Sequence, residues 1–221
     1  MKHVIPALVL GVLLLAALSL GYGGFEATST FNNLGGLNHK LDTLNRTRNG
    51  TGQFTYRSPM WWFGGHGGEH VGPVTLGGSG ALAPYANQAD SLKSELAAIR
   101  ANFEVGFPYS PNQWIWVRPC LELGATGLLV YAQTLSADSK WWSAAWSIGA
   151  APGIEVMGSL PTSYGSFIGL FVKAGYLIPI SGPTWFGDDD LQSFSLSGFA
   201  LQMGIRFGKN VSRAGGEGFE Y

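Results

Sequence analysis

Phe199-Ala-Leu-Gln-Met-Gly-Ile-Arg-Phe207 places a large apolar side chain at every second position, with small, polar or charged residues between them. This period of two predicts a β-strand, because a helix cannot segregate the two sets of side chains on opposite faces. The length of the stretch also matches the roughly 9–11 residues that a tilted strand needs to cross a bilayer. An aromatic residue at each end of the apolar row suits the two membrane interfaces. The stretch therefore predicts one strand of a transmembrane β-barrel.

Seven other segments share this strand pattern, most clearly 166–180 and 99–109, where apolar side chains again take alternate positions. The remaining strands are expected at 24–31, 53–65, 71–83, 113–133 and 141–158. Long connections are expected at 32–52, 84–98, 134–140 and 181–193, and tight ones at 66–70, 109–112 and 159–164. Long loops on one rim and tight turns on the other are typical of outer-membrane barrels. The sequence therefore predicts an all-β fold, a single eight-stranded antiparallel up-and-down barrel that spans a membrane.

Short helical turns are expected in two of the long loops. Leucines recur from Leu34 to Leu44 at intervals of three and four residues. In a second loop, Asp90 is placed to cap a short helix that runs to Ile99. Spacings of three and four put side chains on one face of a helix, so both segments fit a helical turn at the barrel rim.

The rows opposite the apolar ones carry ionisable residues. If the apolar rows face lipid, these residues point into one lumen, where opposite charges can pair. The predicted lumen charge network consists of Glu104, Arg118, Glu122, Glu155, Lys173 and Arg206. The reverse assignment gives a soluble barrel with an apolar core. The charged rows are also rich in glycine, which favours the first assignment, because an eight-stranded barrel is barely wide enough for its own side chains.

Composition and the N-terminal sequence indicate an exported envelope protein. Charged residues make up 12% of the 221 residues, against about 25% in ordinary soluble domains. The net charge of −1 and the lack of a Lys/Arg cluster argue against a nucleic-acid partner. A positive start and an apolar run predict a cleaved signal peptide over residues 1–21, with an uncleaved anchor as the alternative. The barrel domain is expected over 22–207 and a C-terminal tail over 208–221.

In architecture, and over its whole mature length, the chain resembles the small eight-stranded outer-membrane barrels of the OmpA/OmpX-like type. That resemblance implies a C-terminal signal for the outer-membrane insertion machinery, formed by Phe199, Leu201, Met203, Ile205 and Phe207. The chain departs from the family pattern because a tail follows the usual terminal Phe. A second resemblance, to a poorly characterised group of Gly-rich exported barrels, is carried by Leu37-Asn38-x-x-Leu41, Phe63-Gly-Gly-His-Gly and Leu76-Gly-Gly-Ser-Gly.

Two motifs are candidate metal sites. His66-Gly-Gly-Glu-His70 has the H-x-x-E-H spacing of inverted zinc proteases, which requires a helix. Its glycines disfavour a helix and predict a hairpin turn, across which His66, Glu69 and His70 could still hold a metal loosely. Asp188-Asp189-Asp190 is the other metal candidate, for Ca²⁺ or for a divalent bridge to lipopolysaccharide phosphates.

The sequence thus predicts an outer-membrane barrel with a structural or surface-interaction role, without catalytic activity or cofactors. The expected partners are membrane lipid, lipopolysaccharide and the insertion machinery, and not nucleic acid. Two alternatives stay open: a soluble secreted or periplasmic barrel that binds an apolar ligand inside, and a barrel-borne hydrolase or lipid-modifying enzyme. Seven tryptophans near strand ends are interpreted as an interfacial aromatic belt: Trp61, Trp62, Trp114, Trp116, Trp141, Trp142 and Trp146.

Overall fold

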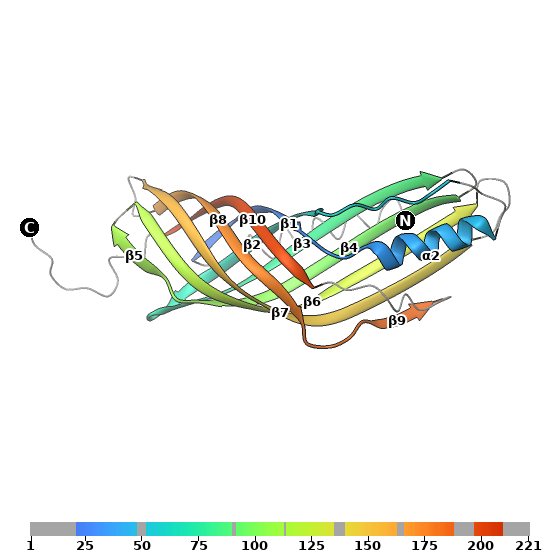
Figure 1. The fold of residues 1–221 in the computed structure, drawn as a ribbon. Helices are drawn as coiled ribbons and strands as arrows, with labels where there is room; N and C mark the ends of the chain where they lie inside the picture. Colours follow the sequence, from blue (N-terminus) through green and yellow to red (C-terminus); the bar gives the residue numbers. More distant parts are fainter. Residues whose placement is uncertain are drawn as a thin grey trace, which may run out of the picture.

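The computed structural model describes residues 21–47, 52–89, 92–112, 114–134, 140–162, 166–187 and 197–209. Its elements are β1 (Tyr22–Thr30), α2 (Gly35–Arg46), β2 (Met60–Val71), β3 (Val74–Ala89), β4 (Leu92–Gly106), β5 (Tyr109–Asn112), β6 (Ile115–Thr134), β7 (Lys140–Pro161), β8 (Ser166–Pro179), β9 (Thr184–Gly187) and β10 (Gly198–Lys209). All strands except β5 and β9 form a closed barrel (Figure 1).

The barrel is antiparallel, and strands that follow one another in the chain lie side by side. β1 pairs with β2 on one side and with β10 on the other, so the first and last strands close the ring. The short strands β5 and β9 extend the sheet locally by pairing with β6 and β7. The predicted eight-stranded up-and-down barrel is therefore confirmed.

The barrel wall is uneven in height. β1 and β10 have 9 and 12 residues, whereas β6 and β7 have 20 and 22. We call the end where Tyr22 pairs with Gly208 the proximal end, and the opposite end distal. Beyond the closed ring, β3, β4, β6 and β7 continue distally as a curved sheet, and α2 lies beside them (Figure 1). This sheet, with α2 and residues 52–59, is named the distal projection.

The helical turn expected around Leu34–Leu44 is confirmed as α2, but the turn expected between Asp90 and Ile99 is wrong. Residues from Leu92 onward form β4, with Leu92 and Leu96 both pointing inward. Residues four apart share a face in a strand as well as in a helix, so this spacing could not distinguish the two structures. Among the described residues, no helix is long and apolar enough to cross a membrane.

Several boundaries differ from the prediction, among them the tight turn expected at 109–112, where the chain forms the short strand β5. His66 to His70 lies inside β2 rather than in a turn, and the chain reverses at Gly72, whose φ is +60°. The expected long loop 84–98 is mostly strand, because β3 and β4 run on into the distal projection. Residues 53–59 are not part of β2, because their backbone pairs with α2 side chains instead.

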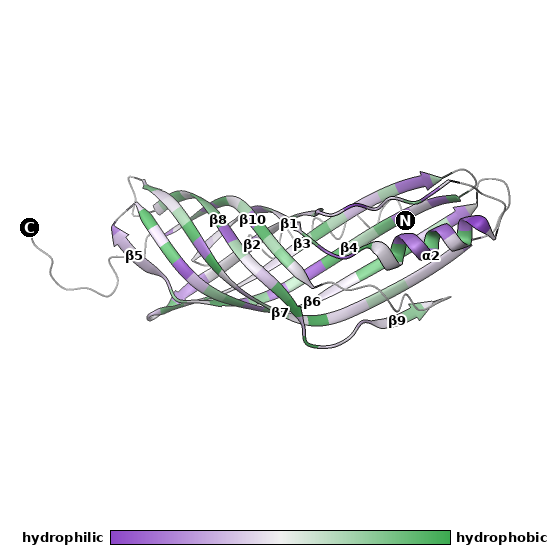
Figure 2. Cartoon of the chain, viewed as in Figure 1, coloured by the Kyte–Doolittle hydropathy of each residue, from purple (hydrophilic) through white to green (hydrophobic). Residues whose placement is uncertain are grey.

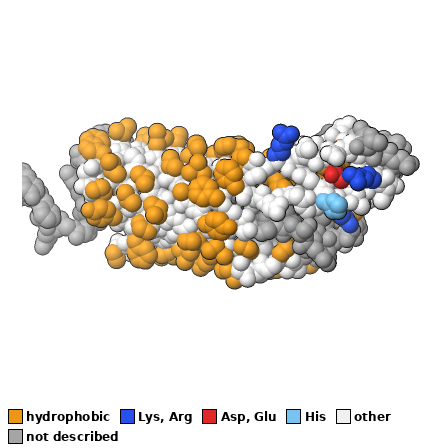
Figure 3. Space-filling model, in the orientation of Figure 1, with side chains coloured by type: hydrophobic (Ala, Val, Ile, Leu, Met, Phe, Trp, Pro, Cys, Tyr) orange, Lys and Arg blue, Asp and Glu red, His pale blue; other side chains and the backbone are white. Residues whose placement is uncertain are grey.

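The outer face of the barrel is apolar. Leu170 is 68% exposed and Val172 51%, while the alternate residue Lys173 is 4% exposed and points inward. Hydropathy alternates along the strands (Figure 2), and on the face shown in Figure 3 hydrophobic side chains gather over the barrel and are sparser over the described part of the distal end. We call this surface the apolar belt; it includes Phe25, Phe63, Phe103, Leu121, Leu123, Ile154, Val156, Ile168, Leu170, Val172, Met203 and Ile205.

The tryptophans divide between the two faces of the wall. Those that face outward and are exposed are Trp61, Trp114, Trp142 and Trp146. Trp62 and Trp141 are buried inside, and Trp116 packs in an interior aromatic cluster at the proximal end. The interfacial-belt interpretation is therefore wrong for these three. For Trp62 and Trp141 the reason is that each is adjacent to an outward-facing tryptophan, and adjacent residues fall on opposite faces of a strand.

Candidate functional site: the barrel interior

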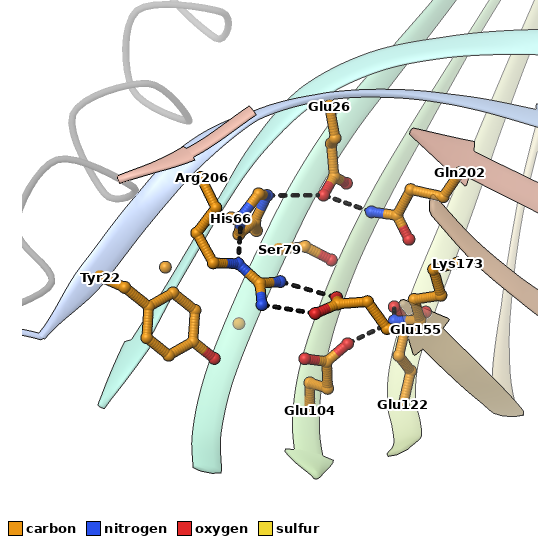
Figure 4. Close-up of a pocket in the computed structure, with 12 residues that line it drawn as sticks. Tyr22, Glu26, His66, Ser79, Glu104, Glu122, Glu155, Lys173, Gln202 and Arg206 are labelled. Carbon is orange, nitrogen blue, oxygen red and sulfur yellow. Dashed lines mark hydrogen bonds and ion pairs between the residues drawn. The ribbon is translucent and has the colours of Figure 1, made fainter. Parts of the chain in front are cut away.

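The centre of the interior is an ion network around Glu155 on β7. Arg206 donates from Nη1 to Glu155 Oε1 at 2.5 Å and from Nη2 to Oε2 at 2.7 Å (Figure 4). Arg118 donates to the same Oε2 at 2.7 Å. All three residues are at most 5% exposed. Paired guanidinium groups from two strands thus hold one buried carboxylate by charge-assisted hydrogen bonds.

The network continues across the lumen through Glu104 and Glu122. Arg118 also reaches Glu104 Oε1 at 2.6 Å. Lys173 pairs with both Glu104 and Glu122, and Glu122 accepts a further bond from Arg100. Acids and bases therefore alternate along the network, so each buried charge has an opposite charge beside it.

A third branch joins Glu26 and His66 to Arg206. His66 Nδ1 lies 3.0 Å from Glu26 Oε2, and Arg206 Nε donates to His66 Nε2 at 3.1 Å. Because arginine only donates, Nε2 must accept, and the ring proton lies on Nδ1, which donates to Glu26. Gln202 donates to the same carboxylate. Both ring nitrogens of this neutral imidazole are engaged.

The structure brings all six residues of the predicted lumen charge network together and adds others that the prediction missed. The network contains the carboxylates Glu26, Glu104, Glu122 and Glu155 and the cations Arg100, Arg118, Lys173 and Arg206. Four acids thus face four bases, and the interior is formally neutral. Glu26 could have been predicted from the sequence, because it lies between Phe25 and Ala27, which face outward from β1.

Aromatic side chains fill the proximal end of the lumen. Ring centroids lie 5.8 Å apart for Tyr22 and His70, 5.7 Å for His70 and Trp116, and 6.2 Å for Trp116 and Phe167. The free volume enclosed within the ion network is about 10 Å³, room for roughly one water molecule. The proximal lumen is therefore packed with side chains rather than open as a pore.

Glycines make this packing possible. A Cβ on Gly204 would lie 2.7 Å from the Phe171 ring and 2.2 Å from the backbone oxygen of Phe25. A Cβ on Gly68 would lie 2.6 Å from the Tyr22 hydroxyl. Glycine is thus required where β2 and β10 pass beneath bulky lumen residues, and the glycines of His66-Gly-Gly-Glu-His70 serve a strand rather than a turn.

The motif residues considered as metal ligands do not converge. His66 and His70 face the lumen, whereas Glu69 faces outward, so the three side chains cannot share an ion. No group of three or more His, Cys, Asp or Glu side chains within the described ranges is arranged to hold a metal. Asp188, Asp189 and Asp190 lie outside the described residues. Cys120 is buried on the inner face of β6.

The side chains of the expected insertion signal lie on the outer face of β10. Phe199, Met203, Ile205 and Phe207 are 45–48% exposed, and Leu201 between them is half-buried. They form part of the apolar belt, next to β1 on one side and β8 on the other.

The distal interior is apolar instead of charged. Its buried cluster comprises Leu34, Leu37, Leu41, Phe54, Tyr56, Met60, Trp62, Ala81, Ala83, Ala89, Leu92, Leu96, Ala98, Leu128, Val130, Ala132 and Trp141. Leu37 and Leu41 of α2 are fully buried in it. The leucine spacing that predicted a helix therefore marks the face by which α2 packs against the sheet.

Three solved structures are similar to this chain at low sequence identity. The attachment invasion locus protein Ail of Yersinia pestis is 9% identical, with a TM-score of 0.46 over 86% of this chain and 98% of that one. Neisserial surface protein A is 12% identical, with a TM-score of 0.39 over 85% and 96%. A major outer membrane protein from Thermus thermophilus is 9% identical, with a TM-score of 0.45 over 85% and 98%. No protein-family model and no curated protein sequence matches the chain.

Proposed function

We propose that this chain is an outer-membrane β-barrel whose closed part crosses the bilayer, with a structural or surface-interaction role and no catalytic activity. The observation that carries the proposal is the apolar belt around a charged interior. Leu170 at 68% exposure and Lys173 at 4% are the reverse of what a water-soluble barrel requires. In water the belt would be a large exposed apolar surface, which is unfavourable, whereas in a bilayer the hydrocarbon chains would cover it.

The height of the belt supports a membrane-spanning role. Exposed apolar residues follow one another on the outer face of β8 from Ile168 to Ile178 and continue to Ile180. At about 3.3 Å per residue, this row is roughly 40 Å long. A tilt of about 35–45° reduces it to about 30 Å along the barrel axis, close to the thickness of a hydrocarbon core.

The filled lumen supports a role other than transport or catalysis. Bulk solutes need a water-filled channel, and here charged and aromatic side chains occupy the interior. His66 engages both ring nitrogens with Glu26 and Arg206, so neither is available as a general base. The distal projection extends beyond the belt and is the part suited to meet surface partners, lipopolysaccharide among them. The outer row of β10, which ends at Phe207, is suited to recognition by the insertion machinery.

The decisive test places arginine at two depths of the belt. Ile154 and Leu160 both face outward from β7 and are 56% and 65% exposed, but Ile154 pairs with Ala174 in the middle of the β8 row, whereas Leu160 pairs with Ile168 at its proximal edge. In a bilayer, Ile154→Arg should lower the free energy of unfolding by about 2–4 kcal/mol and Leu160→Arg by about 0–1 kcal/mol. Fractionation and heat-modifiable gel mobility first test whether the parent protein is a membrane-bound barrel. Urea titration in lipid vesicles then measures the free energy of unfolding of both variants. Equal, small effects, with the protein recovered in detergent-free buffer, would contradict the proposal.

A further inference from the structure

In the distal projection the sheet forms a trough, and a segment of the chain outside the sheet covers it. Where β1, β8 and β10 have ended, β3, β4, β6 and β7 continue with apolar side chains on their concave face. The trough wall is formed by Ala83, Ala89, Leu92, Leu96, Ala98, Leu128, Val130, Ala132 and Trp141. α2 and residues 52–56 fill it. The wall is thus continuous barrel sheet, and its cover belongs to the β1–β2 connection.

The cover is held together by its own hydrogen bonds. Asn38 donates to the Tyr56 carbonyl at 2.9 Å and accepts from the Tyr56 amide at 2.8 Å. Asp42 accepts from the Phe54 amide at 2.6 Å, and Asn45 donates to the Gly52 carbonyl at 2.9 Å. These three polar residues, one turn apart on α2, bond to alternate residues of the extended segment. Helix and segment therefore form one unit.

The contacts between this unit and the trough wall are of a different kind. Leu37, Leu41 and Phe54 pack on the wall through apolar contact. The Tyr56 hydroxyl adds a polar contact with the wall, 3.1 Å from both the carbonyl and the Oγ of Ser94. α2 begins with two glycines, and Asn33 Oδ1 accepts a hydrogen bond from the Gly35 amide at 3.0 Å. The bonds between α2 and the extended segment do not involve the wall, so the unit can leave the wall without breaking them.

One polar atom in the trough wall points to a ligand. Trp141 is only 6% exposed, and its indole Nε1 has no hydrogen-bond partner among the described residues. A buried donor without an acceptor is unfavourable and uncommon in folded proteins, so it signals a missing acceptor. Trp141 pairs with Ala132 across the sheet, and Ala132 pairs with Ser94. Two polar groups, the Trp141 N–H and the Ser94 hydroxyl, therefore share one row of the wall, next to the row that holds Val130 and buried Ser143.

We propose that the trough is a binding site for a long acyl chain with an oxygen-rich head, and that the α2 unit is its displaceable cover. The head accepts hydrogen bonds from Trp141 Nε1 and from the Ser94 hydroxyl, which bonds to Tyr56 when the cover is docked. The chain lies along Leu96 and Val130 toward the closed barrel, replacing the contacts of the α2 leucines with apolar contacts of similar extent. This inference goes beyond the proposed envelope role and does not depend on it, because the trough is the same in a soluble barrel.

Binding is tested on the full mature chain held in amphipol, with a fluorescent polyene fatty acid as the probe. The probe should bind saturably, one per chain. Trp141→Phe keeps an aromatic ring but removes the donor, and should weaken binding about 3- to 10-fold. The matched control is Trp142→Phe, at a neighbouring tryptophan that faces outward at 44% exposure, and it should leave binding unchanged. Tyr56→Phe removes the bond that holds the cover to Ser94 and should tighten binding by a similar factor.

Displacement of the cover is followed separately with a spin label on Thr43→Cys, on the outward side of α2, in a Cys120→Ala background. The label should become mobile as the fatty acid saturates. Competition with unlabelled oleate and with a lysophospholipid distinguishes a free fatty acid from a membrane lipid as the natural source of the acyl chain. Non-saturable binding, equal effects of Trp141→Phe and Trp142→Phe, or a label that stays immobile at saturation would each overturn the proposal.

Discussion

The two halves of the interior are stabilised by opposite means, although one continuous wall surrounds both. Around Glu155 in the proximal half, buried charges are joined by direct ion pairs. In the distal half, Leu37 and Leu41 pack against an apolar cluster on the sheet, and the Tyr56 hydroxyl bonds to the wall at Ser94. A buried ion network is intolerant of losing one partner, because the remaining charge stays desolvated. The stability lost with apolar contacts is in proportion to the atoms removed, so a substitution in the distal half can loosen it locally without unfolding the barrel.

The largest effect is expected from Glu155→Gln. This change keeps the shape of the side chain but leaves Arg118 and Arg206 without the carboxylate that they share. Loss of one partner of a buried pair costs about 3–5 kcal/mol, and here two guanidinium groups are affected. Urea titration of the protein in lipid vesicles should show this loss as a lower free energy of global unfolding.

The matched control uses an ion pair outside the interior. Lys93 and Glu95 on β4 are 2.8 Å apart, but each side chain is nearly half exposed to solvent. Glu95→Gln should leave global unfolding unchanged within error, because water screens such a pair. If Glu155→Gln proved as harmless as Glu95→Gln, the view that charge pairing organises the proximal half would be wrong.

An intermediate and local effect is expected from Leu41→Ala. Leu41 is fully buried between α2 and the trough wall, and removal of its side chain should cost about 2–4 kcal/mol. The loss of stability should be confined to the cover, because Leu41 joins α2 to the wall by apolar contact. Hydrogen exchange measures this directly: α2 amides should exchange faster, while amides of β10 keep their protection.

The control for Leu41→Ala is His39→Ala, on the exposed side of the same helix. It should leave α2 exchange nearly unchanged. Faster exchange of β10 in the Leu41→Ala protein would mean that the two halves unfold as one unit, and the contrast between them would fail.

The proximal half was largely predictable from sequence because strands impose a simple rule. Residues two apart share a face, so placing Leu170 and Val172 outward forces Lys173 inward, and the same phase applies to Arg206 on the last strand. His66 was wrongly placed for a physical reason. Its flanking glycines suggest a turn, whereas they are small because Tyr22 and neighbouring strands occupy the space that a Cβ would need.

The distal half was less predictable because its determinants lie between segments. The helix was visible in the leucine spacing, but nothing local to residues 52–56 indicates that their backbone pairs with Asn38 and Asp42. Leu92 and Leu96 fit both a helix and a strand, and the choice is made by the long register with β6. Tertiary partners thus decided the structure where the sequence period was ambiguous.

The smallest effect is expected from alkaline pH, and it should act on the distal half alone. Burial raises the pKa of the Tyr56 phenol above its ordinary value of 10.0, and nearby Glu95 adds to the rise, although the bond to Ser94 opposes it. A raised pKa means that the docked cover retains the phenol proton more tightly than the released cover does. The docked state therefore keeps its full stability below pH 10 and loses it as the pH rises from there toward the folded-state pKa.

A spin label on Thr43→Cys should accordingly become more mobile above about pH 10, the ordinary pKa of a tyrosine. Other tyrosines and lysines titrate in the same range, so the informative quantity is the difference between the parent and Tyr56→Phe. The variant lacks the ionisable group and should show a smaller alkaline rise in mobility, from a baseline that is already raised because the bond to Ser94 is missing. Equal pH profiles in the two proteins would show that Tyr56 does not hold the cover, and the distal half would then rest on apolar contact alone.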